Sequence, residues 1–206
     1  MRKLVGVLAV LSIGCFAVSA NAATYGWEDG VGTILGFYGN ISNPTNVTDF
    51  VHTGNHALRV TEDPVGGTPQ AYVAWITGLT DGDIVDASFW AYDDTPGVSP
   101  SVRIWGHYTT SDDINNYQGS ASGNYDYTQG IGWEEIGWSW TFDSSGGTRD
   151  ALVIEVRLYT GADPTDYYID DLTVTTSSPT AQIHFAPEPA SIALLALGAL
   201  GLLRRR

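Results

Sequence analysis

The stretch DIVDASFWAY, residues 83–92, decides the fold class. Along it, small or apolar side chains alternate with polar or large aromatic ones. The first set is Val85, Ala87, Phe89 and Ala91. The second set is Asp86, Ser88, Trp90 and Tyr92. Because successive side chains of a β-strand point to opposite faces of a sheet, this alternation predicts a strand with one face on a core.

Similar runs recur along the chain and are separated by segments rich in Gly, Pro, Asp and Ser, which favour turns. We expect strands near residues 24–27, 47–51, 56–61, 70–77, 83–92, 101–108, 133–142, 151–159 and 167–175. The composition agrees, because 12% of the residues are aromatic and 24 are glycines. The sequence therefore predicts an all-β fold, an antiparallel two-sheet jelly-roll β-sandwich.

Residues 1–22 have the pattern of a secretory signal peptide. Arg2 and Lys3 precede a short apolar run, and an Ala-Asn-Ala cleavage signal ends at Ala22. Cys15 lies in the run, but a lipoprotein signal would have Leu where Ser12 stands, so lipidation is the less favoured alternative. The mature chain then contains no cysteine, and its stability must come from packing or from a metal rather than from disulfides.

The C-terminal segment 187–206 has three parts: a Pro-Glu-Pro triplet, an apolar run and a basic end. The residues outside the apolar run are Pro187, Glu188, Pro189, Arg204, Arg205 and Arg206. The segment resembles the PEP-CTERM sorting signal of Gram-negative bacteria. This resemblance implies processing by an exosortase, transient anchoring in the inner membrane through an apolar helix, and delivery to the cell surface or exopolysaccharide matrix. An ordinary membrane anchor is the alternative, although the apolar run falls short of the ~20 residues that span a bilayer.

Residues 23–176 are expected to form the folded domain, and 177–186 a short linker to the sorting signal. Residues 23–186 contain 22 acidic residues, four arginines and no lysine, a net charge near −18. Such a charge repels nucleic acid and anionic lipid, whereas it attracts metal cations and leaves neutral glycans unaffected. Nucleic-acid binding is therefore excluded from the candidate functions.

Several phrases of the domain, in this order, resemble the jelly-roll, galactose-binding-like carbohydrate-binding modules found beside bacterial glycosidases. They are YGWEDG (25–30), GNHALRV (54–60), TGLTDGDIVDASFWAY (77–92), GWEEIGWSWTF (132–142) and YYIDDLTV (167–174). The resemblance spans most of the domain and implies a noncatalytic module that binds polysaccharide.

The last of these phrases carries two adjacent carboxylates. Strict alternation places Asp170 on one face with Tyr168, Leu172 and Val174, so that its side chain would lie in the core. A buried carboxylate needs a cation or several hydrogen-bond donors, and an oxygen-liganded metal suits a thiol-free domain. The resemblance implies a structural Ca²⁺ held by Asp170 and Glu28. The alternative is that backbone N–H groups satisfy Asp170, and Asp171 is expected to point the other way, into solvent.

The same alternation predicts a binding face on the strands near 83–92, 101–108 and 151–159. Their outward-facing candidates are Trp90, Tyr92, Arg103, Trp105, His107, Glu155, Arg157 and Tyr159. The resemblance implies that these strands share one sheet with a concave outer surface, where rings stack on sugars and charged groups bind hydroxyls. The alternative is that residues 109–130 cover the tryptophan, which then serves packing only.

No catalytic motif is present, and Glu134 and Glu135 point to opposite faces of one strand, so we expect no enzyme. Asp112, Asp113 and Asn115 lack the spacing of a calcium-binding loop and are expected to form a solvated turn. Ile136, Trp138, Trp140 and Phe142 are expected in the core.

Two functions remain: a noncatalytic glycan-binding module, or a purely structural envelope or matrix protein. Joint exposure of Trp90, Trp105 and Tyr159 in one groove would favour the first. A glycosidase is the third and least favoured alternative, because only Asp86 and Glu155 could supply its facing carboxylates.

Overall fold

The computed structural model describes residues 21–93, 102–125, 132–161 and 163–186. Within these ranges the chain contains twelve strands and no helix, and it forms two six-stranded antiparallel sheets. The predicted β-sandwich is therefore confirmed. The apolar segment expected to form a sorting helix lies outside the described residues, and none of the described residues forms a helix that could cross a membrane.

Sheet A has the strand order β3-β4-β11-β6-β9, with β1 beside β11. Its strands are β1 (Asn21–Tyr25), β3 (Ile41–Val47), β4 (Ala57–Glu62), β6 (Ile84–Asp93), β9 (Glu134–Thr141) and β11 (Asp166–Thr176). β11 pairs with β6 along one side, and with β4 and then β1 along the other. It is therefore an interior strand of sheet A.

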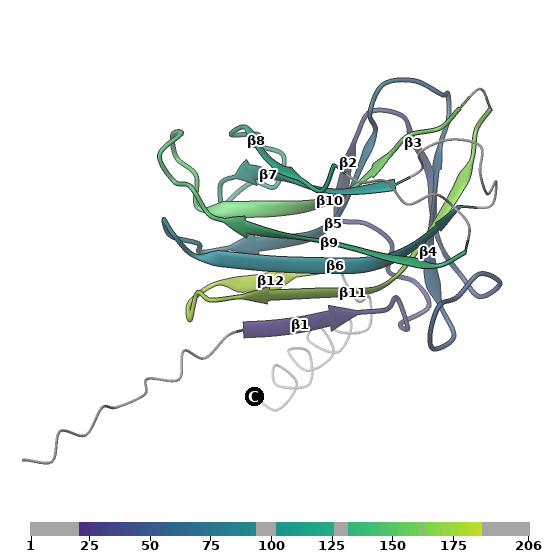
Figure 1. The fold of residues 1–206 in the computed structure, drawn as a ribbon, viewed down its shortest axis with the longest axis horizontal. Helices are drawn as coiled ribbons and strands as arrows, with labels where there is room; N and C mark the ends of the chain where they lie inside the picture. Colours follow the sequence, from purple (N-terminus) through teal and green to yellow (C-terminus); the bar gives the residue numbers. More distant parts are fainter. Residues whose placement is uncertain (1–20, 94–101, 126–131, 162, 187–206) are drawn as a thin grey trace, which may run out of the picture.

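Sheet B has the strand order β12-β5-β10-β7-β8, with β2 beside β5. Its strands are β2 (Gly36–Tyr38), β5 (Gln70–Thr77), β7 (Val102–Thr109), β8 (Ser120–Gly123), β10 (Ala151–Leu158) and β12 (Gln182–His184). Figure 1 shows β7, β8 and β10 of this sheet in the upper part of the view, and β6, β11 and β1 of sheet A in the lower part.

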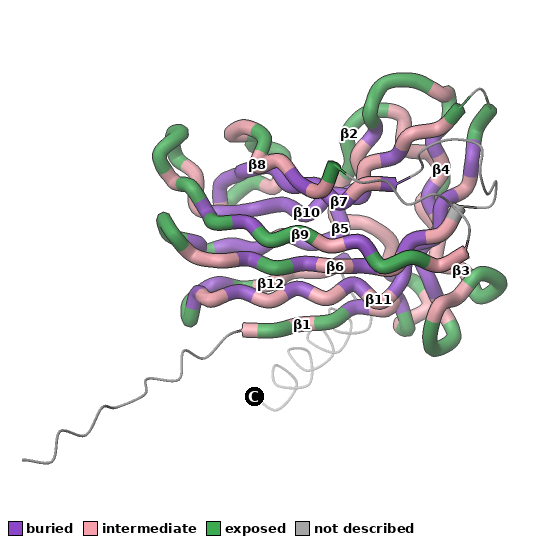
Figure 2. The backbone as a smooth tube through the Cα atoms, viewed as in Figure 1, coloured by how far each residue is buried: buried purple, intermediate pink, exposed green. Residues whose placement is uncertain are grey.

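The core lies between the sheets and consists of the side chains that alternation predicts. On β6 these are Val85, Ala87, Phe89 and Ala91, and on β10 they are Leu152, Ile154, Val156 and Leu158. Figure 2 shows buried segments along the central strands and exposed segments in the loops. A protein without disulfides depends on this apolar burial, at about 25 cal/mol per Å² of area removed from water.

The short strands depart from the sequence prediction. β2, β8 and β12 were not expected, and β3 lies at Ile41–Val47 rather than near 47–51. β3 contains Pro44 and the left-handed Asn43, with φ of 48°, and its register shifts between Ser42 and Thr45. Sequence patterns disfavour such residues in strands, although an edge strand with a bulge tolerates them.

Both ends of the fold extend beyond the expected domain. β1 begins at Asn21, inside the expected signal peptide, and β12 lies inside the expected linker and pairs with β5. Ala186 is 4% exposed and belongs to the core. Strand structure therefore continues past residue 176. β10 pairs with one edge of β5, and Gln182–His184 pair with the opposite edge.

Trp138 was expected in the core but is 39% exposed. It shares its strand face with the buried Trp140, but β9 is an edge strand of sheet A. Alternation identifies the face of a residue, whereas burial also depends on whether a strand lies at the centre or the edge of its sheet.

Candidate functional site

The eight predicted ligand-binding residues lie in two different sheets. Trp90 and Tyr92 extend from β6 in sheet A, whereas the other six belong to β7, β10 or the residue after β10, on the sheet B side. β6 pairs with β9 and β11 and not with β7. The expectation that the three strands share one sheet is therefore wrong, and Trp90 and Trp105 do not line one groove.

On the outer face of sheet B, a charged network surrounds Glu155, which is fully buried. One carboxylate oxygen lies 2.5 Å from Nδ1 of His107, which is itself 1% exposed. The other oxygen accepts a hydrogen bond of 2.7 Å from Nε of Arg157. Because both oxygens have protein partners, Glu155 acts by fixing the positions of His107 and Arg157.

Arg157 links this network to the aromatic residues of the same face. Its guanidinium lies 4.5 Å from the centre of the Trp105 ring, a cation–π contact. The Tyr125 ring meets Trp105 edge-on at 5.2 Å. Arg103 lies 5.3 Å from the ring of Tyr125 and 5.4 Å from that of Tyr159. Arginine and aromatic groups therefore alternate across this face.

Trp105 itself is only 8% exposed. Its indole N–H donates to the hydroxyl of Ser120 at 2.9 Å, and the Tyr125 ring packs against it. Both partners belong to the segment 109–130. For this residue the alternative holds: the segment after β7 covers the tryptophan.

The exposed rings on this side are tyrosines that the sequence interpretation missed. Tyr117 and Tyr125 are 62% and 61% exposed and flank β8, and Tyr38 on β2 is 64% exposed. The only signal in the sequence is the high tyrosine content of residues 109–130. Backbone bonds from Gln118 to Tyr108 and from Tyr108 to Gly119, each 2.8 Å, hold the segment against β7. The backbone next to Tyr117 is thus held against β7.

Tyr72 on β5 lies in the middle of this face and was also missed. It is 8% exposed, and burial, together with the negative charge of Glu155, raises its pKa to about 12. The Tyr38 and Tyr117 hydroxyls add smaller effects in the same direction. Tyr72 therefore keeps its proton at all physiological pH values and remains a hydrogen-bond donor.

On sheet A, the predicted orientation of Asp170 is wrong. The core residues of β11 include Tyr167, Ile169 and Leu172, and the register with β6 shifts between Asp170 and Thr173. This bulge places Asp170 on the outer face, where it pairs with Trp90 across the sheet. It is nevertheless fully buried, and the backbone of residues 52–53 lies against its carboxylate.

Backbone N–H groups of His52 and Thr53 donate to one carboxylate oxygen of Asp170, at 3.0 and 3.1 Å. The N–H of Asp171 donates to the other at 2.7 Å. The pKa of Asp170 is nevertheless raised, because burial outweighs these bonds. Asp171, expected in solvent, instead binds the His52 ring and the Thr53 hydroxyl, each at 2.6 Å. The bulge explains this orientation of the Asp171 side chain, since Asp171 has a left-handed φ of 49°.

Glu28 secures the other end of the same segment. One oxygen accepts from the backbone N–H groups of Asn55 and His56, at 2.8 and 3.0 Å. These bonds, led by that of Asn55, lower the pKa of Glu28. Three carboxylates from two separate parts of the chain thus hold residues 52–56 in place.

The fit of a Ca²⁺ ion can be judged around Gly26. A Cβ atom on this glycine would lie 3.5 Å from Asp170 Oδ1 and 3.9 Å from Asp171 Oδ1, so carboxylate oxygens face its backbone. Asp170 Oδ1 already accepts a hydrogen bond from the backbone N–H of Asp171, and Asp171 Oδ1 accepts one from the Thr53 hydroxyl. The described residues include no group of three or more acidic, His or Cys side chains arranged to hold a metal. Calcium binding by Glu28 and Asp170 stays a prediction.

Comparisons with known proteins bear on both parts of the chain. Residues 186–206 match the PEP-CTERM protein-sorting motif, which implies export and a membrane-anchored transit. No curated protein matches the sequence. Solved structures of carbohydrate-binding modules share the fold. The CBM22-1 xylan-binding domain of Xyn10C from Paenibacillus barcinonensis has a TM-score of 0.52 at 14% identity, covering 80% of this chain and 99% of that one.

A family 30 carbohydrate-binding module has a TM-score of 0.51 at 13% identity, covering 76% of this chain and 99% of that one. At such low identity the similarity establishes the fold alone. It confirms the resemblance to jelly-roll carbohydrate-binding modules that the sequence phrases indicated. The chain therefore carries a PEP-CTERM sorting motif after a β-sandwich with the fold of carbohydrate-binding modules.

Proposed function

We propose that the domain is a noncatalytic module that binds a neutral polysaccharide at the outer face of sheet B. The observation that carries this proposal is the pair of exposed tyrosines, Tyr117 beside His107 and Tyr125 beside Trp105, next to a network of buried Glu155 and His107 with the partly exposed Arg157. Sugar rings stack on aromatic faces, and sugar hydroxyls bind charged and phenolic groups. The domain's negative charge favours a neutral glycan over an anionic one.

The destination proposed for the protein is the cell surface or exopolysaccharide matrix of a Gram-negative bacterium. The match of residues 186–206 to the PEP-CTERM motif supports processing by an exosortase. A module displayed in a polysaccharide matrix would meet its ligand there, so the sorting signal and the fold point to the same environment.

A glycosidase is not supported by the geometry. Asp86 lies on the outer face of sheet A, and Glu155 lies buried on the outer side of sheet B. The two sheets of a sandwich are themselves about 10 Å apart, so these carboxylates lie on opposite sides of the protein and cannot flank one glycosidic bond.

Affinity electrophoresis in gels containing soluble xylan, mixed-linkage β-glucan or β-galactan tests the binding function. The xylan probe follows from the similarity to the xylan-binding domain. Replacing Tyr117 and Tyr125 together with alanine should weaken retention, with a loss of roughly 1 to 3 kcal/mol. Tyr117→Phe, which keeps the ring, should bind like the unchanged protein. Absence of binding to every probe would favour the purely structural alternative.

A further inference from the structure

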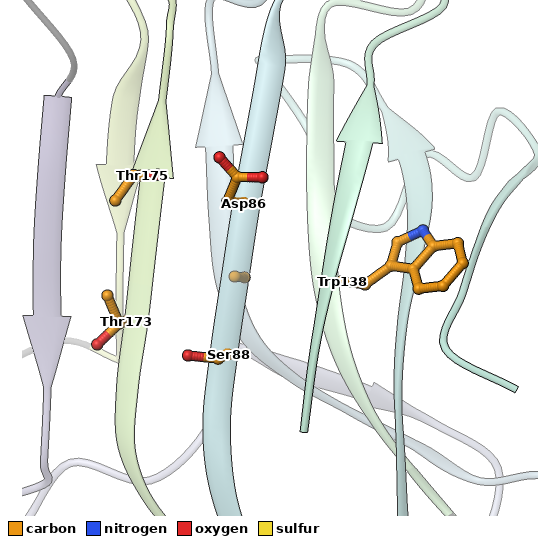
Figure 3. A pocket seen from close by; sticks show the side chains of 6 residues that line it. Asp86, Ser88, Trp138, Thr173 and Thr175 are labelled. Atoms are coloured by element: carbon orange, nitrogen blue, oxygen red, sulfur yellow. The ribbon is translucent and has the colours of Figure 1, made fainter. Parts of the chain in front are cut away.

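The outer face of sheet A contains a shallow hollow that the proposed function does not use. Its volume is about 270 Å³. The lining residues are Asp86, Ala87, Ser88, Trp138, Thr173 and Thr175. Figure 3 shows the polar side chains of β6 and β11 grouped together, while Trp138 points away from them. The hollow therefore presents two threonines, one serine and one carboxylate to solvent.

Asp86 is the charged group of this hollow. It is exposed, and among the described residues its carboxylate has no hydrogen-bond partner. Ser88 donates to Glu135 at 2.9 Å, so a second carboxylate lies next to the hollow. No lysine or arginine lines it. Such a surface accepts hydrogen bonds from a neutral, hydroxyl-rich ligand and repels an anionic one.

An aromatic rim continues the same face toward the end of β6. Trp90 follows Ser88 by two residues and is partly exposed, and the His52 ring stacks on it with centres 3.9 Å apart and planes 15° apart. Trp133 lies 5.4 Å from His52 and 5.8 Å from Tyr92. From Asp86 to Trp90 the strand covers about 14 Å, enough for an elongated ligand rather than a single small group.

The His52 ring of this rim is held by hydrogen bonds. His52 binds Asp171 at 2.6 Å through its ring, while its backbone N–H binds Asp170 at 3.0 Å. Its position against Trp90 is therefore set by the two adjacent aspartates of β11. A preorganised ring loses less conformational freedom on binding than a mobile one, which favours affinity.

We propose that this face of sheet A is a second glycan-binding surface, so that one domain contacts two polysaccharide chains on opposite sides. The unpaired carboxylate of Asp86 beside a row of aromatic rings fits a neutral polysaccharide, and the same features fit neither nucleic acid nor an anionic membrane. The two-chain arrangement rests on the proposed binding at sheet B. Sheet A and sheet B variants separate the two claims.

The test uses the full chain in a detergent without a sugar headgroup, with soluble xylan, mixed-linkage β-glucan and β-galactan as probes in affinity electrophoresis. Thr173→Arg fills the hollow with a long side chain. Thr141→Arg places the same charge at an exposed position of β9, outside the hollow. Retention should fall about three- to tenfold for Thr173→Arg and stay unchanged for Thr141→Arg.

The sheet B double variant, Tyr117→Ala with Tyr125→Ala, should still be retained weakly by the glycan gel. Adding Thr173→Arg to this double variant should remove the remaining retention. If the double variant alone abolishes all retention, and Thr173→Arg behaves like Thr141→Arg, the second surface is refuted while the proposed function stands. If the unchanged protein binds none of the probes, both are refuted. A change in sedimentation of Thr173→Arg without glycan would identify the face as a contact between copies, and would also overturn the proposal.

Discussion

Replacing Glu155 with glutamine tests whether the buried network organises the outer face of sheet B. The substitution keeps the shape of the side chain but removes a charge that is fully buried between His107 at 2.5 Å and Arg157 at 2.7 Å. Glutamine can accept through one oxygen only, so its NH₂ group cannot accept the hydrogen bond that the second carboxylate oxygen received. Loss of a hydrogen bond to a charged group costs about 1.5 to 3 kcal/mol, and an uncompensated buried charge adds to this.

We therefore expect the free energy of unfolding to fall by about 3 kcal/mol. This value lies at the lower end of the usual cost of breaking a buried ion pair, because Arg157 is partly exposed. For a domain of this size the melting temperature should drop by about 6 to 12 °C. Urea denaturation followed by tryptophan fluorescence measures the change. Glu135→Gln is the matched control, since it removes a charge at an exposed site bonded to Ser88 and should cost under about 0.5 kcal/mol. Equal stability losses in the two variants would refute the reasoning.

Three further predictions concern the tail, calcium and alkaline stability. Deleting residues 187–206 should leave the melting temperature unchanged and abolish membrane retention in cell fractionation, because every described strand ends before that segment; an unfolded product would contradict this. If calcium binds, a chelator should lower the melting temperature of the unchanged protein and of Asp49→Asn but not that of Asp170→Asn. The stabilisation that the chelator removes is about 2.7 kcal/mol when calcium is at a hundredfold excess over its Kd. Identical chelator responses in all three would refute the ion. The pKa of Tyr72 is raised to about 12, so the stability that its neutral hydroxyl contributes is complete below pH 10 and is lost as the pH rises toward 12. Over that pH range, the urea midpoint of Tyr72→Phe should therefore fall less than that of the unchanged protein. Equal falls in the two proteins would contradict the assignment.

The inward and outward faces of the long strands could be predicted from sequence because alternation is a local property. On β7, Val102 and Ile104 are fully buried in the core, while Arg103 and Trp105 lie on the other side, as expected. The same holds for Glu155 between the core residues of β10. Period-two patterning therefore located the members of the charged network before their contacts were known.

Sheet membership could not be predicted in the same way. β6 and β7 follow one another in sequence, yet β6 pairs with β11, and β7 pairs with β10. Such pairings join residues far apart in the chain, and a pattern within one strand carries no information about its partner. The single sheet expected for Trp90 and Trp105 came from the resemblance to other jelly rolls, and in this chain the two residues lie on two separate surfaces. The covering tyrosines were missed for a related reason, since the segment that carries them has no periodicity.

The two adjacent carboxylates of YYIDDLTV have a physical explanation that alternation alone conceals. One extra residue in the strand lets Tyr167 and Ile169 face the core on one side of the bulge, and Leu172 and Val174 on the other. The extra residue must adopt a left-handed φ, which aspartate tolerates better than most side chains do, and Asp171 has φ of 49°. Because the bulge turns both carboxylates toward the segment 52–53, Asp170 can bind its backbone N–H groups while Asp171 binds its side chains. The pair therefore positions His52 against Trp90, and a substitution of either aspartate is expected to act on the outer face of sheet A through that ring.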